Sequence, residues 1–219
     1  MGAQADQVRD SILDKVLERK LLPGDRIDES ELRERLGVSG TPIREALIAL
    51  ETAGVVERRP RDGARVTSLD LEGVIKITEV LAEAEGSAAY LAARRINSTQ
   101  AANLKAAAQD CTDFAEGRSA KDANYYGLNL LFHQCLFQAS GNEYMQESIF
   151  ALGSRVVAYL AARHSLPGEV QRSAQDHARI TQAILSGEAD LARTLMVNHV
   201  TFNDRLAIDV MNTMNVDKT

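Results

Sequence analysis

The sequence is poor in cysteine and lacks any long apolar run. Among its 219 residues only Cys111 and Cys135 occur, and no Cys-x-x-Cys pair is present. This excludes a disulfide framework and favours reduced thiols. No apolar segment approaches the roughly 18 residues that a membrane-spanning helix needs, and the first residues lack the basic-then-apolar pattern of a signal peptide. We therefore expect a cytoplasmic protein with no membrane partner.

Motifs of several common enzyme classes are missing too. We find no Gly-rich phosphate loop, no nucleophile elbow, no internal repeat and no sustained heptad pattern. No Gly/Ser-rich or Pro-rich linker occurs either, so two domains would be closely coupled rather than loosely tethered. With 45% hydrophobic residues, the chain can form one large or two modest domains.

Positive charge is scarce in total but locally concentrated. The net charge of −6 disfavours indiscriminate binding to nucleic acid, because such binding depends on Lys and Arg at phosphates. One short stretch is nevertheless rich in arginine, with Arg44, Arg58, Arg59, Arg61 and Arg65. A basic patch on an acidic chain would leave DNA affinity to a specific site. The alternative is a solvated hairpin with no partner.

The segment that carries these arginines has the pattern of a winged helix-turn-helix. An amphipathic helix over 6–20 comes first. A short helix over 29–36 follows, with Asp28 as its cap and Glu31 placed to complete a capping box. Gly37 ends this helix, and the turn after it is too short for anything but a sharply angled helix pair.

The second helix of this pair is expected to face DNA. Thr41 is its predicted N-cap, and a proline follows at the first helical position, where its missing N–H costs nothing. The next apolar residues share one face, which leaves Thr41 and Arg44 pointing outward. Two short strands over 55–58 and 64–66 then flank a turn that ends at Gly63, and we call this hairpin the wing.

From Leu71 onward the pattern is helical throughout, and Asp70 is a suitable cap for the first helix. We place the domain boundary there, with domains over 1–69 and 70–219. Breaks at Gly, Pro and Asn divide the second domain into six helices, and the short connections predict an antiparallel bundle. The predicted helices span 71–95, 99–116, 120–139, 143–164, 169–185 and 190–212. The predicted fold is mainly α, a winged helix-turn-helix followed by an all-α bundle.

Three of the four histidines lie on apolar faces of predicted bundle helices. His133, His177 and His199 belong to three different helices, and Asn129 lies one turn before His133 on the same face. Neutral imidazoles that meet in an apolar interior are costly unless they are hydrogen-bonded or bind a cation, which makes a divalent metal site a good explanation. The simpler alternative is a set of hydrogen-bonded core histidines. His164 lies outside the pattern, and we expect it at the surface.

The first part of the chain resembles the DNA-binding domain of the GntR family of bacterial transcription regulators. The resemblance rests on Leu22-Pro23-Gly24, Gly37-Val38-Ser39, Thr41-Pro42-Ile43-Arg44-Glu45-Ala46-Leu47, Leu50-Glu51, Gly54-Val55-Val56 and Gly63. It implies a homodimer on a pseudo-palindromic double-stranded operator, with Thr41 and Arg44 in the major groove. Ser39 would bind phosphate, and the wing from Arg61 to Gly63 would reach the adjacent backbone or minor groove. Gly40 stands where the family usually has a base-reading arginine, so the operator sequence is not implied.

The second part resembles the FCD-type effector domain of the FadR subfamily. The resemblance rests on the segment from Asn129 to His133, on Ser140-Gly141-Asn142, and on the segments around His177 and His199. It implies a divalent metal such as zinc, nickel or manganese, with Asn129, His133, His177 and His199 as ligands. Asn129 replaces the usual acidic ligand and brings no negative charge, which predicts weaker metal retention.

The same resemblance implies a small organic acid as effector. Such domains often carry an effector-binding arginine four residues before the glutamate that matches Glu85, and that position is Leu81 here. Arg155 and Tyr159, one turn apart on the fourth bundle helix, are the candidates to bind the carboxylate instead. An interhelical salt bridge is the alternative role for Arg155.

These patterns favour a ligand-responsive transcription repressor over two rivals. One rival is a regulator for which the metal itself is the signal. The other is a metalloenzyme, in which three histidines with open coordination positions polarise a carbonyl or activate water. The faces that carry the histidines offer no convincing general acid or base, and an enzyme would not require the winged helix-turn-helix. We therefore predict that the protein is not an enzyme.

Overall fold

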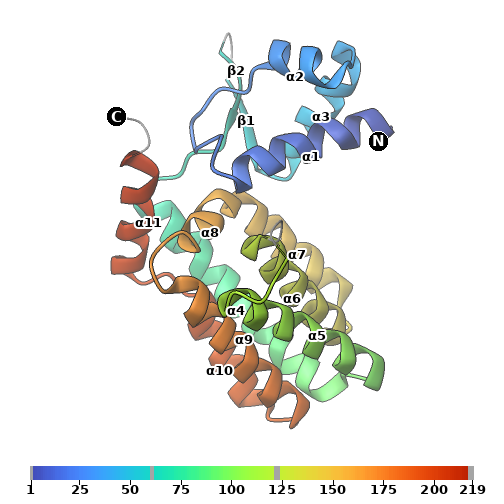
Figure 1. The fold of residues 1–219 in the computed structure, drawn as a ribbon, viewed down its shortest axis with the longest axis vertical. Coiled ribbons are helices and arrows are strands. Elements are labelled where there is room, and N and C mark those ends of the chain that lie inside the picture. Colours follow the sequence, from blue (N-terminus) through green and yellow to red (C-terminus); the bar gives the residue numbers. More distant parts are fainter. Residues whose placement is uncertain (1, 60–61, 121–123, 217–219) are drawn as a thin grey trace.

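The structure is a computed structural model that describes residues 2–59, 62–120 and 124–216. Two bodies lie end to end along the long axis, a small one built from α1–α3 with a β-hairpin and a larger one built from helices (Figure 1). The elements are α1 (Ala3–Leu17), α2 (Glu29–Leu36), α3 (Gly40–Thr52), β1 (Val56–Arg59), β2 (Gly63–Val66), α4 (Leu71–Arg95), α5 (Ser98–Ala115), α6 (Tyr125–Ser140), α7 (Glu143–Arg155), α8 (Val157–Arg163), α9 (Glu169–Leu185), α10 (Ala189–Val200) and α11 (Asp204–Val216). The predicted winged helix-turn-helix followed by an all-helical domain is confirmed.

Local capping chemistry explains where α2 begins. The Asp28 carboxylate accepts hydrogen bonds from the N–H groups of Ser30 at 2.8 Å and Glu31 at 3.0 Å, as an N-cap should. The second half of the predicted capping box does not form. The Glu31 carboxylate instead binds Lys15 of α1 at 2.7 Å and Arg35 at 3.2 Å. The Lys15 contact links α2 to α1, and Glu31 does not cap the N-terminus of α2.

The helix that was expected to face DNA begins earlier than predicted. The N-cap position of α3 is Ser39 rather than Thr41, and its side chain makes no capping bond. The helix extends back over Gly40 because only Val38 and Ser39 separate it from the left-handed Gly37 that ends α2. Thr41 therefore lies within the first turn, where its side chain is free to face outward.

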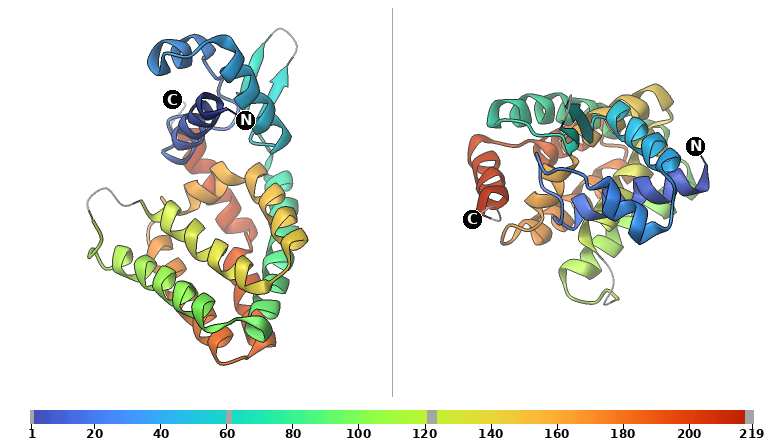
Figure 2. Two further views of the ribbon diagram at one scale, coloured as in Figure 1. Left: turned by 90° about the vertical axis from the view of Figure 1, so that its right-hand side faces the viewer. Right: turned by 90° about the horizontal axis from the view of Figure 1, so that it is seen from above.

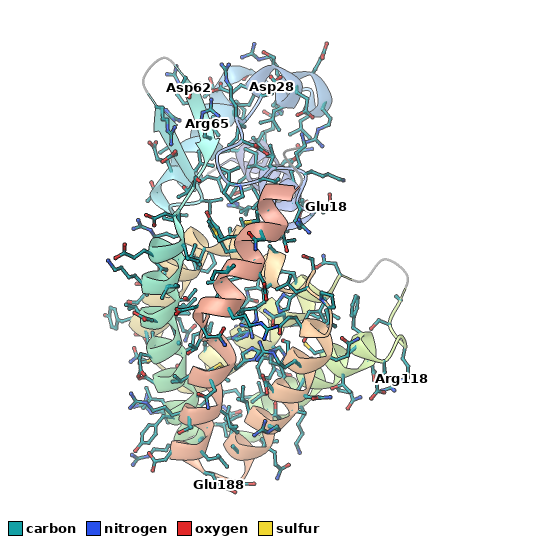
Figure 3. All side chains as sticks on the ribbon, turned by 90° about the vertical axis from the view of Figure 1, so that its left-hand side faces the viewer. Glu18, Asp28, Asp62, Arg65, Arg118 and Glu188 are labelled. Carbon is teal, nitrogen blue, oxygen red and sulfur yellow. The ribbon has the colours of Figure 1, made fainter. Side chains whose placement is uncertain are left out.

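The wing is an antiparallel pair of β1 and β2, with Val56 opposite Val66 and Arg59 opposite Gly63. Val56 and Ala64 belong to the buried cluster of the small domain, whereas Arg59 is exposed. The predicted turn residues 60 and 61 lie outside the described residues. Figure 3 places Asp62 and Arg65 near the end of the molecule that lies farthest from Glu188, at the opposite tip of the bundle.

Two of the six predicted bundle helices are each divided in two, so α4–α11 are eight helices in the described residues. The predicted helix 143–164 breaks at Val156, which has φ −113° and ψ 10° and separates α7 from α8. The predicted helix 190–212 breaks after Val200, and the buried Phe202 lies in the short link to α11. The third helix begins at Tyr125 rather than at 120, and residues 121–123 lie outside the description.

Helix α4 is the long central helix of the bundle and packs closely on α10. A Cβ atom on Gly86 would lie 2.5 Å from Val197 Cγ2 and 3.3 Å from the Arg193 carbonyl oxygen, so only glycine permits this approach. The buried face of α4 is rich in alanine, which also keeps the two helix axes near one another. The charged Glu85 is nevertheless buried on that face, at 6% exposure.

The two bodies share an apolar core at their junction. Val16 of α1 and Val66 of β2 belong to the same buried cluster as the bundle core. The Arg19 guanidinium donates to Ser165 Oγ at 3.1 Å and to the Thr213 carbonyl at 3.0 Å. Helices α8 and α11 thus reach the small domain, as Figure 2 shows from two further directions. The close coupling predicted from the missing linker agrees with this contact.

Candidate functional site

The outer face of the small domain contains a groove between α2, α3 and the wing. Its volume is about 580 Å³, and its lining includes Glu29, Arg33, Gly40, Thr41, Arg44, Leu47, Arg58, Arg59, Gly63 and Ala64. Four arginines and a single glutamate give the groove a positive balance. Such a surface suits the phosphates and base edges of DNA.

Three of the predicted DNA-binding residues meet in this groove, namely Thr41, Arg44 and Gly63. Ser39 is exposed at the N-cap position just before α3, with no capping bond to occupy its hydroxyl. Arg61 lies outside the described residues. The wing arginines are oriented by neighbours, because Arg58 approaches Glu51 at 3.4 Å and Arg59 pairs with Glu57 at 2.6 Å.

The second candidate site lies inside the bundle, where α6, α9 and α10 bring three histidines together. One ring nitrogen from each of His133, His177 and His199 lies within 4.8 Å of the other two, and all three side chains are buried. The sequence prediction that these histidines converge is confirmed. Packing holds them in place, since the His177 ring stacks on Phe132 at a centroid distance of 3.8 Å.

The geometry of the pair His177 and His199 fits a shared cation. Their Nε2 atoms lie 3.2 Å apart, and two nitrogens bound to one zinc ion at about 2.0–2.1 Å lie about 3.3 Å apart. Burial lowers the pKa of each imidazole well below 6.5, with a further contribution from the neighbouring imidazoles, so both rings are neutral. Neutral imidazoles with their lone pairs available are the form that binds metal.

Two carboxylates that were not among the predicted site residues, Glu85 and Asp176, lie close to this cluster. Glu85 Oε2 lies 2.7 Å from His133 Nδ1, a close ion-pair distance without hydrogen-bond alignment. Asp176 Oδ2 lies 3.4 Å from His199 Nδ1, where it favours the tautomer that leaves Nε2 free. The position of Glu85, an acidic residue on the alanine-rich face of α4, could have indicated its place beside the histidines. Asp176 had no such signal, because its approach depends on how α9 and α10 pack.

Asn129 lies on α6 one turn before His133 and is half-buried. Its carboxamide oxygen accepts a hydrogen bond from Ser173 Oγ of α9 at 3.4 Å. Ser173 itself lies one turn before His177, so Asn129 lies between two of the three histidine helices. The amide oxygen is thereby oriented, but it adds no negative charge; the charges come from Glu85 and Asp176.

Arg163 connects the histidine cluster to α8. Its side chain is 4% exposed, and its Nη1 donates to the backbone carbonyl of His199 at 2.9 Å. Its Nε donates to Glu169 at 2.8 Å, while its Nη2 has no hydrogen-bond partner among the described residues. Burial lowers the pKa of Arg163, and the Glu169 carboxylate opposes that effect. A buried guanidinium with one unpaired nitrogen is a ready partner for an anion.

The structure places Arg155 and Tyr159 at the junction of the two domains. The Tyr159 hydroxyl accepts from the Leu69 N–H at 2.8 Å and donates to the Leu69 carbonyl at 3.1 Å. Arg155 lies against the turn after α3, where a Cβ on Gly54 would come within 2.6 Å of its Cγ. Gly54 has φ +77°, which a side chain would also strain. Both residues thus contact the small domain, whereas Arg163 bonds the backbone carbonyl of His199.

His164 was expected at the surface, but the structure shows it half-buried. Its ring packs edge-on against Tyr125 at a centroid distance of 4.9 Å, and its Nδ1 has no partner among the described residues. Burial, together with the Arg163 charge, lowers its pKa to about 3. No sequence signal indicated this burial, because a histidine near a helix end before a proline is usually exposed.

Comparison with known families settles what these two sites belong to. A family model described as bacterial regulatory proteins of the gntR family matches residues 4–66, and a model of the FCD domain matches residues 76–202. The chain is a GntR-family transcription regulator. Its second domain is an FCD domain. Regulation of transcription, not catalysis, is therefore its function, and the metalloenzyme hypothesis is set aside.

Relatives of this GntR regulator align over most of its length. A probable D-xylose utilization operon transcriptional repressor of Paenarthrobacter nicotinovorans is 29% identical over 90% of this chain and 85% of its own. The repressor RspR of Escherichia coli K12 is 26% identical over 82% of this chain and 78% of its own. LutR of Bacillus subtilis is 26% identical over 83% of this chain and 91% of its own.

Solved structures show the same fold. E. coli McbR/YncC superposes with a TM-score of 0.77 at 20% identity and covers 100% of both chains. A putative GntR transcriptional regulator from Rhodococcus sp. RHA1 superposes with a TM-score of 0.72 at 14% identity, over 96% of this chain and 99% of its own. No helix among the described residues of the regulator has the length and apolarity to cross a membrane.

Proposed function

We propose that this GntR regulator is a repressor that binds a pseudo-palindromic operator as a homodimer. A small organic acid, bound beside a divalent metal at the histidine cluster, would control its affinity for the operator. The DNA-binding part would be residues 1–69 and the effector-binding and dimerisation part residues 70–219. Repression is inferred from the relatives, two of which are named as repressors.

The groove supports the proposed mode of DNA binding. Thr41 and Arg44 face it from the first turns of α3, the position from which a recognition helix contacts base edges in the major groove. Gly63 would let the wing lie close to the adjacent DNA backbone, and Arg61 precedes it by two residues in the sequence. Ser39 would donate to a phosphate and so fix the register of the helix on the duplex.

We propose His133, His177 and His199 as the metal ligands, with Asn129 as a neutral fourth ligand. The 3.2 Å separation of two Nε2 atoms and the neutral imidazoles support this assignment. Zinc, nickel and manganese all accept such a set. A bound metal ion would act as a Lewis acid toward an effector carboxylate. Glu85 and Asp176 would supply the negative charge that Asn129 lacks, from positions beside two of the imidazoles.

An acid effector fits the charge next to this cluster. Arg163 keeps one guanidinium nitrogen unpaired in a buried position, and the Tyr125 hydroxyl also has no hydrogen-bond partner among the described residues. These two donors, with the metal, would bind a carboxylate. Arg155 and Tyr159, predicted from sequence to bind the effector, are better placed to transmit its binding to the DNA-binding domain.

The chain of contacts through α8 is the observation that carries the proposal. Arg163 at the end of α8 bonds the backbone of His199, and Tyr159 one turn earlier bonds both backbone groups of Leu69. Leu69 lies in the short segment between the wing and α4. A ligand that repositions His199 or Arg163 can therefore bias the orientation of the DNA-binding domain, and a preference of a few kcal/mol suffices.

Exposed apolar side chains support the proposed homodimer. Val80 of α4 is 57% exposed and Phe150 of α7 is 64% exposed, on two helices that pack against each other. Large exposed apolar side chains on neighbouring helices are typical of a protein interface. The alternative, in which metal alone is the signal, shares the same histidines and the same α8 contacts.

The test uses the purified full chain before and after chelation. A thermal-shift screen against carboxylates, sugar acids and amino acids identifies the compound class that stabilises the protein. Fluorescence titration of a selected operator then measures affinity with metal, with compound and with both. Stabilisation and an affinity change that need both metal and compound support the proposal. A change with metal alone supports the metal-responsive alternative, and an operator affinity that no condition alters contradicts both.

A further inference from the structure

We infer that Arg33 of α2 reads a guanine of the operator and does so through the space that Gly40 leaves open. The inference rests on the proposed operator binding and adds a specificity residue from the first helix of the helix-turn-helix pair. Its basis is the placement of one guanidinium over the start of α3.

The Arg33 guanidinium lies directly beside the first residue of α3. A Cβ atom built on Gly40 would be 3.4 Å from Arg33 Nη2, which is van der Waals contact. An alanine at this position would just touch the guanidinium, and any longer side chain would compete with it for the same space. Glycine at position 40 thus leaves the space beside the Arg33 guanidinium unfilled.

Arg33 lines the groove together with Thr41 and Arg44. Thr41 and Arg44 lie in the first turns of α3. In a helix-turn-helix this end of the second helix lies closest to the base edges. A planar guanidinium donates two parallel hydrogen bonds to guanine O6 and N7, the commonest specific contact in the major groove. Arg33 would therefore contact a base next to the one that Arg44 approaches.

The Arg33 side chain is available for this role. It is exposed, and among the described residues no ion pair or hydrogen bond holds it. Arg35, two residues later on the same helix, differs in this respect. Its guanidinium bonds the Glu31 carboxylate and Ser11 Oγ, so it is committed to the contact between α1 and α2. Arg35 is therefore a suitable control for Arg33, because it lies on the same helix but its guanidinium is hydrogen-bonded within the protein.

The test compares operator preference among wild type, Arg33→Ala, Arg33→Lys and Arg35→Ala, each as the full chain. Selection from a random DNA library gives the preferred operator of each protein, and fluorescence titration measures its affinity at several salt concentrations. Arg33→Ala should lose the preference for one G·C pair in each half-site and bind the wild-type operator about tenfold more weakly. Arg33→Lys should lose the same preference, because lysine keeps the charge but not the paired donors.

Arg35→Ala is the control and should keep every base preference. Thermal melting of all variants shows that the fold is retained. If Arg33→Ala keeps the wild-type preferences and weakens operator and random DNA equally, with a shallower salt dependence, Arg33 binds phosphate and the inference is overturned. If wild type itself selects no sequence, the proposed operator binding fails, and the inference fails with it. The two failures are thereby distinguished.

Discussion

The Tyr159 hydroxyl of α8 is hydrogen-bonded to both backbone groups of Leu69, as acceptor from the N–H and as donor to the carbonyl. One side chain of the FCD domain thus holds the segment that leads out of the wing. Tyr159 is 1% exposed, so no water can replace these bonds without a rearrangement. The two hydrogen bonds hold Leu69, between the wing and α4, against α8.

Tyr159→Phe should weaken the coupling between effector and DNA. The change keeps the ring and removes both bonds, and leaving Leu69 with unpaired backbone groups should cost about 1–3 kcal/mol of unfolding free energy. Operator affinity should then respond less to metal and effector. Denaturant melts and operator titrations measure the two effects, with Tyr144→Phe as the control because Tyr144 is 74% exposed. An unchanged response to effector would show that α8 does not carry the coupling.

Arg44→Ala should weaken operator binding by at least about 1 kcal/mol, since the lost guanidinium faces the groove with no partner among the described residues. A fluorescence titration at fixed salt measures the change. Arg118→Ala is a suitable control, because Arg118 lies on the FCD domain far from the wing (Figure 3). Equal affinities for wild type and Arg44→Ala would contradict the placement of α3 in the major groove.

His177→Ala should lose bound metal while the fold is retained. The imidazole is one of only three in the cluster, and two remaining nitrogens bind a divalent ion far more weakly. Elemental analysis gives the metal content, and circular dichroism checks the fold. His164→Ala should keep its metal, because His164 lies outside the cluster. The same metal content in His177→Ala and wild type would remove the assignment.

Asn129→Asp should bind the metal more tightly than wild type. The carboxylate would add a negative charge at the position where the amide oxygen now accepts from Ser173. Competition with a chelator measures the affinity, and Asn142→Asp, at the start of α7, controls for the change in net charge. A weaker affinity in Asn129→Asp would mean that Glu85 already supplies all the charge that the site tolerates.

The metal-free protein should lose stability as the pH falls below about 6.5. The folded pKa of His164 is about 3, well below the value near 6.5 of an unfolded histidine, so the unfolded state takes up a proton first. This one group lowers the unfolding free energy by about 1 kcal/mol between about pH 7.5 and pH 5.5. His177 and His199 act in the same direction. Thermal melts across this range measure the effect, and His164→Gln should show a shallower decline. An equal slope in the variant would contradict the burial of a neutral His164.

Features set by local chemistry were predictable from the sequence. Asp28 and Asp70 cap the helices that they were expected to cap, because the capping bond spans only two or three residues. The convergence of His133, His177 and His199 was also predictable, since a helical period fixes which residues share a face. The apolar faces of these helices meet in the interior of one bundle, so the three histidines converge there.

Features set by packing between distant segments were not predictable. The break falls at Val156 rather than at Gly153, three residues earlier, and the Tyr159 hydroxyl in the helix after the break bonds Leu69. The same applies to Arg163, whose contact with the His199 carbonyl joins residues that lie 36 positions apart in the sequence. The sequence therefore predicted the three histidines that converge but not Arg163, which bonds the His199 carbonyl. Arg155 as an effector-binding residue stays a prediction.

The shared core at the domain junction limits how this regulator can be rebuilt as a biosensor. Hybrid sensors are made by joining the DNA-reading half of one protein to the sensing half of another. Here Val16 and Val66 are packed into the bundle core, and the turn at Gly54 lies against Arg155. A splice at residue 69 would leave both halves with mismatched surfaces. A working hybrid needs α8 and α11 exchanged together with the DNA-reading half, or their contact residues copied into the recipient.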